Sequence, residues 1–316
     1  MRTNVKYIYF DTNTINDFKE FSEDDWLAFQ NANKLYKFPY SAAHILDLMN
    51  SSPEYLNEDF LIINELSKNN FLDMSKDGSI TIRRLDIPIS SVFDKIVKDY
   101  NESGEKALKD RKYFLPGFDR YKIDVDMMHK KSFLYQMAEK TKGIFDGNFS
   151  NFILNHALDN IDSHSTYNQM RKQAQDAIAH TKEYKTYNSI PEEGKIFLQM
   201  FASESFDSDL FETLNSYMSL SYKIQGKDWT ALSTPHKIID VYTLLDIVKG
   251  FSEKIGKNNR WTNMLHDAEH CANASMAKYF ISNEKNNYAK VNFIRENFNL
   301  SFKVITAADF INKFRM

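Results

Sequence analysis

Short apolar strands alternate with amphipathic helical patterns at both ends of this chain of 316 residues, and almost nowhere between them. Residues 5–10 predict a strand, and Phe21–Leu35 predicts a helix that Ser22 caps. A short extended segment, Tyr36–Tyr40, then precedes a second helix that Ser41 caps. Strands that alternate with helices favour a parallel sheet with helices on its outside.

The C-terminal end repeats this alternation. A helix through His266 is followed by a strand at residues 278–282, and a second helix by a strand at residues 301–306 and a last helix. We therefore predict an α/β domain with a central, mostly parallel sheet, formed jointly by residues 1–50 and 258–316.

Residues 51–257 predict a mainly helical insertion or lid between these two ends. Gly (9) and Pro (6) are scarce, which favours helices over flexible linkers. The stretch 71–85 is the exception, because "KDGS" between alternating apolar residues predicts a hairpin. Two basic and aromatic stretches, Glu105–Phe114 and Met170–Lys185, are candidates for tracking a phosphate backbone, or are solvated faces.

Composition narrows the class of protein. Cys271 is the single cysteine, which excludes an internal disulfide framework and favours the cytoplasm. No apolar run approaches the roughly 20 residues that span a bilayer, so we expect no membrane association. The net charge of −3 argues against a protein that coats nucleic acid, but not against an enzyme that holds a phosphodiester through a bound metal.

Acidic residues stand at unusual places in the two α/β ends. Asp11 directly follows the apolar strand Tyr7–Phe10, where a turn or helix cap would also explain it. Asp47 and His44 are the two polar residues in "AAHILDLM", a helix whose composition predicts burial. A buried carboxylate needs a hydrogen bond, a charge or a metal, so either a metal or a structural bond between His44 and Asp47 is expected.

Asp267 lies in a helical pattern with Met264, Cys271 and Ala274 on its side. His266 and His270 are four residues apart, which is a zinc-ligand spacing, but a third ligand is missing from the pattern. We therefore expect surface or supporting roles for both histidines.

The strand at residues 278–282 ends in Ser282, Asn283 and Glu284, much as the first strand ends in Asp11, Thr12 and Asn13. Parallel strands would bring these ends to one edge of the sheet, so that Asp11, Asp47, Asp267 and Glu284 converge. Like charges in such a site repel one another, and a hard divalent cation resolves the repulsion. Oxygen ligands suit Mg²⁺ or Mn²⁺, which activate water in phosphodiester hydrolysis.

The first of these motifs resemble those of the PIN domain family of metal-dependent nucleases. That family begins with a strand ending in Asp, then Thr or Ser, and Asn, which correspond to Asp11–Asn13. Its second acid, usually Glu, lies on a helix after a strand and a Ser or Pro. Asp47 in "FPYSAAHILDL" is the corresponding position, about one residue further from Ser41 than usual.

The closing motifs are similar to the same family. "HDAEHCANASMAKYFISNEKN" contains Asp267 as the third acid and His270 three residues later. The strand then ends in Ser282, Asn283 and Glu284, where the family has Asp at the last position. "FKVITAADFINKF" resembles the final strand and helix. The resemblance covers residues 1–50 and 258–316, and implies a PIN-like three-layer sandwich interrupted by a large helical insertion.

The resemblance implies a nuclease that depends on Mg²⁺ or Mn²⁺, with an endoribonuclease as the expected activity and RNA or single-stranded nucleic acid as its partner. Asp11, Asp47 and Asp267 would hold the metal directly or through water, and Glu284 would complete the site. Thr12, Asn13, His44, His270, Ser282 and Asn283 would support these ligands or contact the substrate.

Two other functions remain open from the residues. A non-catalytic PIN-like module would bind RNA or a protein, such as an antitoxin if the chain is a toxin or a defence protein. A phosphatase with Asp11 as nucleophile would need a second Asp at position 13, where the chain has Asn13.

Overall fold

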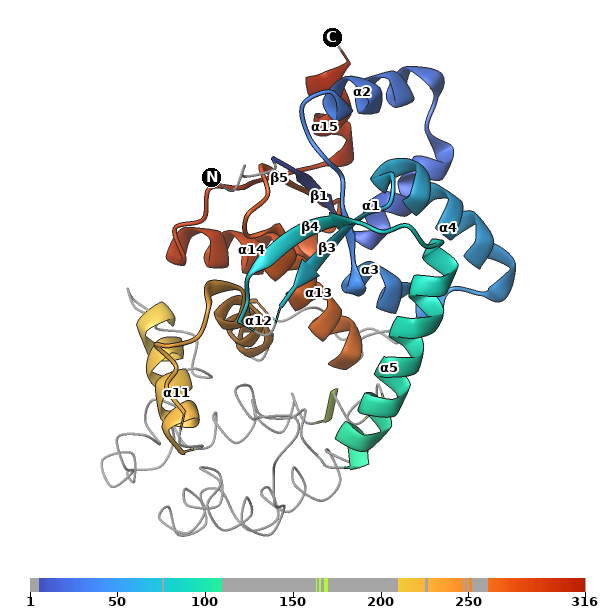
Figure 1. The fold of residues 1–316 in the computed structure, drawn as a ribbon. Helices are drawn as coiled ribbons and strands as arrows, with labels where there is room; N and C mark the ends of the chain where they lie inside the picture. Colours follow the sequence, from blue (N-terminus) through green and yellow to red (C-terminus); the bar gives the residue numbers. More distant parts are fainter. Residues whose placement is uncertain are drawn as a thin grey trace. The chain divides into compact units, whose positions relative to one another are not determined.

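The computed structural model is a mixed α/β structure (Figure 1). Its chain divides into two compact units. The first unit comprises Met1–Asn101, Ser233–Ile239 and His266–Met316, and the second comprises Glu102–Leu232 and Asp240–Leu265. The structure describes residues 6–75, 77–109, 163, 165, 168–169, 210–224, 227–246, 248, 250–251 and 261–315.

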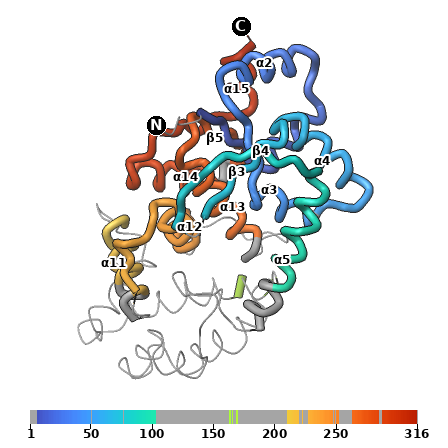
Figure 2. The backbone as a smooth tube through the Cα atoms, in the orientation of Figure 1, coloured from blue at the N-terminus to red at the C-terminus, as the bar shows by residue number. Residues whose placement is uncertain are grey.

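Strands from the two ends of the chain pair in parallel, as the alternating pattern predicted. Strand β1 (Ile8–Phe10) pairs with β5 (Tyr279–Ile281), and β5 pairs with β6 (Lys303–Ile305), in the order β1-β5-β6. Figure 2 shows the first strand in blue beside the late strand β5, although some 270 residues separate them in the sequence. The partners in register are Phe10 and Ile281.

A second small sheet contains the hairpin. Strand β2 (Tyr40–Ser41) pairs in parallel with β3 (Asn70–Met74), and β3 pairs with β4 (Ile80–Arg84) in antiparallel fashion. The hairpin predicted at 71–85 is thereby confirmed. A parallel bridge between Tyr7 and Lys37 joins the segment before β2 to the segment before β1.

Helices of the first unit begin where capping residues predict them. Asp11 caps α1, Ser22 and Asp25 form a capping box on α2, and Thr306 with Asp309 forms one on α15. The first unit contains α1 (Thr12–Asp17), η1 (Phe18–Glu20), α2 (Glu23–Asn33), α3 (Ala42–Asp47), η2 (Leu48–Asn50), α4 (Pro53–Ser67), most of α13 (Trp261–Ala274), α14 (Lys285–Asn297) and α15 (Ala307–Phe314), and α5 (Ile89–Lys109) begins in it.

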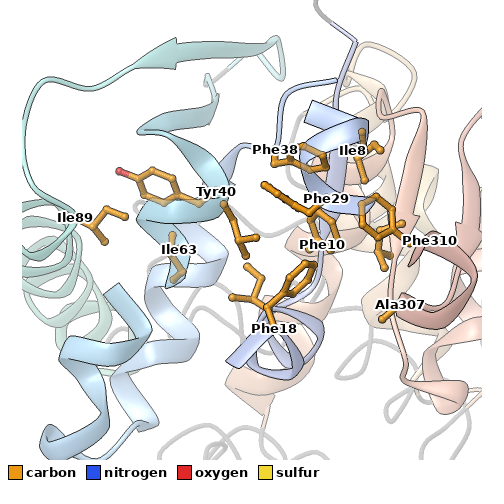
Figure 3. Packing of buried hydrophobic residues seen from close by; sticks show 14 of the residues in the cluster. Ile8, Phe10, Phe18, Phe29, Phe38, Tyr40, Ile63, Ile89, Ala307 and Phe310 are labelled. Carbon is orange, nitrogen blue, oxygen red and sulfur yellow. The ribbon is translucent and has the colours of Figure 1, made fainter. Parts of the chain in front are cut away.

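Strand β1 is buried on both faces, and its successive side chains point alternately to one face and the other. Ile8 and Phe10 point into an apolar core that also contains Phe310 (Figure 3). The Phe10 ring lies 5.4 Å from that of Phe310, centroid to centroid, in an edge-on arrangement. Tyr7 and Tyr9 point to the other face, where the Tyr7 hydroxyl donates to the backbone carbonyl of Asn273 in α13 at 2.6 Å.

The second unit is described through α11 (Leu210–Ile224) and the C-terminal part of α12 (Thr234–Leu245). Tyr222 donates a hydrogen bond to Asp240 at 2.7 Å, and Trp229 donates one to Asn215 at 3.2 Å. The basic stretch Met170–Lys185 and the part of Glu105–Phe114 after Lys109 lie outside the described residues. Among the helices of the described part, none has the length and apolarity needed to cross a bilayer.

Candidate active site

The carboxyl ends of β1 and β5 lie side by side at one edge of the sheet. The Asp11 backbone amide donates to the carbonyl of Ile281 at 3.0 Å, which continues the pairing of the two strands by one step. The predicted meeting of these two strand ends is therefore confirmed. Asp11 and Ser282 are the first polar residues beyond the paired strands, and both are buried.

Asp11 caps α1 through its side chain, which accepts a hydrogen bond from the Thr14 amide at 2.7 Å. The capping role considered from the sequence is thus confirmed. The Asp11 side chain is buried in this position. Burial raises the pKa of Asp11, and hydrogen bonds from Ser282 and Thr14 offset this only in part. The fold therefore disfavours the ionised form of this side chain when no cation is bound.

Asp47 lies at the end of α3, and three side chains donate hydrogen bonds to its carboxylate. His266 contacts one oxygen at 2.8 Å, His270 contacts the other at 2.9 Å, and Thr12 contacts that second oxygen at 2.5 Å. Burial alone would raise the pKa of Asp47, but the bonds and charges of the two histidines hold it well below its usual range. Asp47 is therefore a carboxylate that the fold keeps ionised.

His44 does not form the bond with Asp47 that its spacing in the sequence allowed. Its Nε2 atom lies 2.8 Å from the backbone carbonyl of Phe10, and its Nδ1 atom accepts from the Ser41 amide at 3.0 Å. A carbonyl only accepts and an amide only donates, so the ring is neutral with its proton on Nε2. In agreement, burial and the charge of His270 lower the pKa of His44 to about 3.

Glu284 differs from Asp47 because the groups that donate hydrogen bonds to its carboxylate are the neutral side-chain amides of two asparagines. Asn13 donates to one oxygen, and Asn287 donates to the other at 2.7 Å. The amide of Asn287 must be oriented this way, since its oxygen would otherwise face the carboxylate. Its own oxygen is buried and has no hydrogen-bond partner in the described part of the chain.

Asn283 has a structural role in the described contacts. Its amide donates to Asp17 at 2.6 Å and its oxygen accepts from the Ala307 amide at 3.0 Å, so it joins α1 to the start of α15. Tyr288 lies on the other side of Ser282, to whose carbonyl it donates at 2.6 Å.

Asp267 lies on a neighbouring face of α13 from the one that contacts Asp47. His266 and His270, four residues apart, form the contacting face, and Asp267 is rotated by about 100° from His266. It is half-buried and shares its face with Cys271, the pKa of whose thiol is raised by burial and then by the Asp267 charge.

The described residues contain no group of three or more His, Cys, Asp or Glu side chains placed to hold one metal ion. Magnesium is commonly held by one or two carboxylates, several waters and the phosphate of a substrate, so a three-residue cage is not required. The carboxylate and amide oxygens at this edge are hard donors of the kind that such a cation takes.

Three residues near these acids were not predicted as site residues. Tyr9 was interpreted as an apolar strand residue, although two tyrosines at alternate positions place both hydroxyls on one face of the strand. Asn287 and Tyr288 lie in the first turn of α14, where only the preceding strand end had attracted attention. His266 was expected in a surface or a supporting role, and its burial and its contact with Asp47 agree with the supporting role.

Comparison of the chain with family models, curated proteins and solved structures gives no match in any of the three.

Proposed function

We propose that this protein is a metal-dependent nuclease with a PIN-like fold, and that RNA is its substrate. The observation that carries the proposal is the set of contacts made by three consecutive residues after β1. Asp11 lies against Ser282, Thr12 binds Asp47, and Asn13 binds Glu284. Acids from three parts of the chain thereby gather at the carboxyl edge of a parallel sheet, the usual place for ligands in such folds.

In this proposal a cation is held by Asp11 and Glu284, with Asp47 contributing directly or through water, whereas Asp267 lies on another face of α13 and is not assigned to the cation. Asp11 supports this assignment, since a cation would compensate the buried charge that the fold disfavours. When bound, Mg²⁺ or Mn²⁺ supplies activation of water and stabilisation of the leaving oxygen.

The protein's own groups have separate tasks. Asn13 and Asn287 fix both oxygens of Glu284 without neutralising its charge, which suits a carboxylate that orients a water molecule. His266 and His270 keep Asp47 ionised and fixed, so that its charge is available at the edge of the sheet.

The test is cleavage of labelled RNA and single-stranded DNA by the purified protein with Mn²⁺. We expect cleavage of RNA, its loss on addition of EDTA, and its loss in Asp11→Asn, which keeps the helix cap but removes the charge. Asp24→Asn is the matched control, because Asp24 is an exposed aspartate in the first turn of α2. Cleavage that persists in Asp11→Asn, or that the control also loses, would contradict the proposed site.

The second candidate function is a PIN-like module that binds RNA or a protein without cleaving. It is favoured by the donors that already occupy each of the Asp47 and Glu284 oxygens, and by the lack of a three-ligand cluster among the described residues. RNA binding that is unchanged by Mn²⁺ and EDTA, without cleavage, would support this function over the first.

A further inference from the structure

The Tyr9 side chain is wholly buried in β1, yet its hydroxyl meets polar groups from two other parts of the fold. It lies 2.7 Å from the Ser41 hydroxyl, at the start of α3, and 2.9 Å from Nδ1 of His270 in α13. Asn273, one turn further along α13, donates its amide to the same hydroxyl at 3.3 Å. One phenol thus joins a strand to both helices that support the acid Asp47.

On the Ser41 side, the groups around the Tyr9 hydroxyl are themselves held by further hydrogen bonds. His44 is fixed as the neutral tautomer by Phe10 and by the Ser41 amide, and its ring packs 5.0 Å from the Tyr9 ring. The Ser41 hydroxyl lies 3.1 Å from Nδ1 of His44. These contacts hold the Tyr9 ring and its hydroxyl in one position on the Ser41 side.

The contacts on the other side lead to the acid. The Tyr9 hydroxyl donates to Nδ1 of a neutral His270 or accepts from Nδ1 of a charged one, so the contact holds in either state. Nε2 of the same ring then points at Asp47. Fixing one nitrogen of an imidazole fixes the direction of the other, which is how partners of a histidine orient it in metal sites.

Tyr40 shows that the fold does not need such a network to bury a tyrosine. It lies in strand β2 of the second sheet and is also buried, and its hydroxyl has no hydrogen-bond partner among the described residues. Burial raises the pKa of Tyr40 to about 12. The Tyr9 hydroxyl has four polar partners, the three above and Nδ1 of His44 at 3.4 Å, which is more than burial of a phenol in this fold demands.

We propose that Tyr9 is a positioning residue for the nuclease site, acting through His270 to hold the Asp47 carboxylate in place. The inference rests on the proposed function for its effect on catalysis, whereas the orientation of His270 can be measured without any activity.

The kinetic test compares Tyr9→Phe with Tyr40→Phe, two identical substitutions at buried positions, one in a strand of each sheet. We expect Tyr9→Phe to lower kcat for RNA cleavage roughly 10–100-fold with little change in KM, as removal of a partner that orients a site residue commonly does. Tyr40→Phe should retain both constants. Equal kcat values for the two variants would overturn the inference.

The second measurement is the nitrogen spectrum of the ¹⁵N-histidine-labelled protein in EDTA, with the His270 signal assigned by its loss in His270→Gln. In the wild type we expect one His270 form with a protected proton on Nε2, and in Tyr9→Phe a shift of the Nδ1 signal that Tyr40→Phe lacks. Averaged tautomers in the wild type would overturn the inference even if Tyr9→Phe fails to fold. A wild type that shows the fixed form but does not cleave RNA would refute the proposed function and leave the orienting contact standing.

Discussion

Two aspartates at the same edge of the sheet should respond in opposite ways to the same substitution. Asp47→Asn removes a charge that three donors stabilise, from His266, His270 and Thr12. Hydrogen bonds to a charged acceptor contribute about 1.5–3 kcal/mol each, and asparagine keeps one acceptor atom. A quarter of the Asp47 side chain (25%) is exposed, which weakens these bonds by solvent screening. We therefore expect the free energy of unfolding to fall by about 2–4 kcal/mol.

Asp11→Asn should raise the stability of the metal-free protein at neutral pH. The asparagine oxygen can still accept from the Thr14 amide and cap α1, so the substitution removes little except the buried charge. Because burial raises the pKa of Asp11, its ionised form costs the folded state free energy that asparagine does not.

The pH dependence separates the two effects. The pKa of Asp47 is lowered in the fold, so its stabilisation is complete above the ordinary carboxyl value of about 4 and is lost as the pH falls through the lowered one. The pKa of Asp11 is raised, so its cost is absent below about 4 and grows as the pH rises to the raised value. The advantage of Asp11→Asn should therefore be largest at neutral pH and vanish near pH 4.

The assay is urea unfolding followed by circular dichroism, in EDTA, at several pH values between 4 and 7. The reasoning is refuted if Asp11→Asn is less stable than the wild type at pH 7, or if Asp47→Asn is as stable as the wild type. Added Mn²⁺ should stabilise the wild type and leave Asp11→Asn unchanged, since only the former retains the proposed ligand.

Two pairs of substitutions test packing in the first unit by thermal unfolding. Lys19→Met leaves the buried carboxylate of Asp59 without the ammonium that contacts it, and should cost about 2–4 kcal/mol, whereas Lys68→Met breaks an exposed pair and should cost less than about 1 kcal/mol. Similar losses in both would contradict this reading of burial. Gly78→Ala adds a methyl group where φ is +77° and the Ser233 side chain is in the way, and should cost about 2–4 kcal/mol. A companion Ser233→Gly should restore part of that loss, and no restoration would exclude the overlap.

Local patterns identified most of the elements around the site. A continuous apolar run located β1, alternating apolar residues located the hairpin β3–β4, and serine followed by acidic residues located the start of α2. These elements follow from interactions within a few residues, such as caps and turns, which a sequence displays directly. The pairing of β1 with β5 was also predictable, because strands that alternate with helices form parallel sheets.

The partners of the acids were decided by the tertiary structure. The spacing of His44 and Asp47 suggested a bond between them that the fold does not form. His44 instead contacts the Phe10 carbonyl, and Asp47 accepts from His266 and His270. The contacts of Asp47 depend on the packing of α13 against β1, and α13 lies more than 200 residues after Asp47 in the sequence.

The sequence by itself determined where carboxylates stand relative to strands, because a strand end and the residue after it are local facts. Only the tertiary structure decided which carboxylate is stabilised as an anion and which is strained by burial. Asp11 and Asp47 are the same side chain at one edge of one sheet, and their pKa values move in opposite directions. The difference comes from the donors that distant segments bring within about 3 Å, since hydrogen bonds and local charge act only at that range.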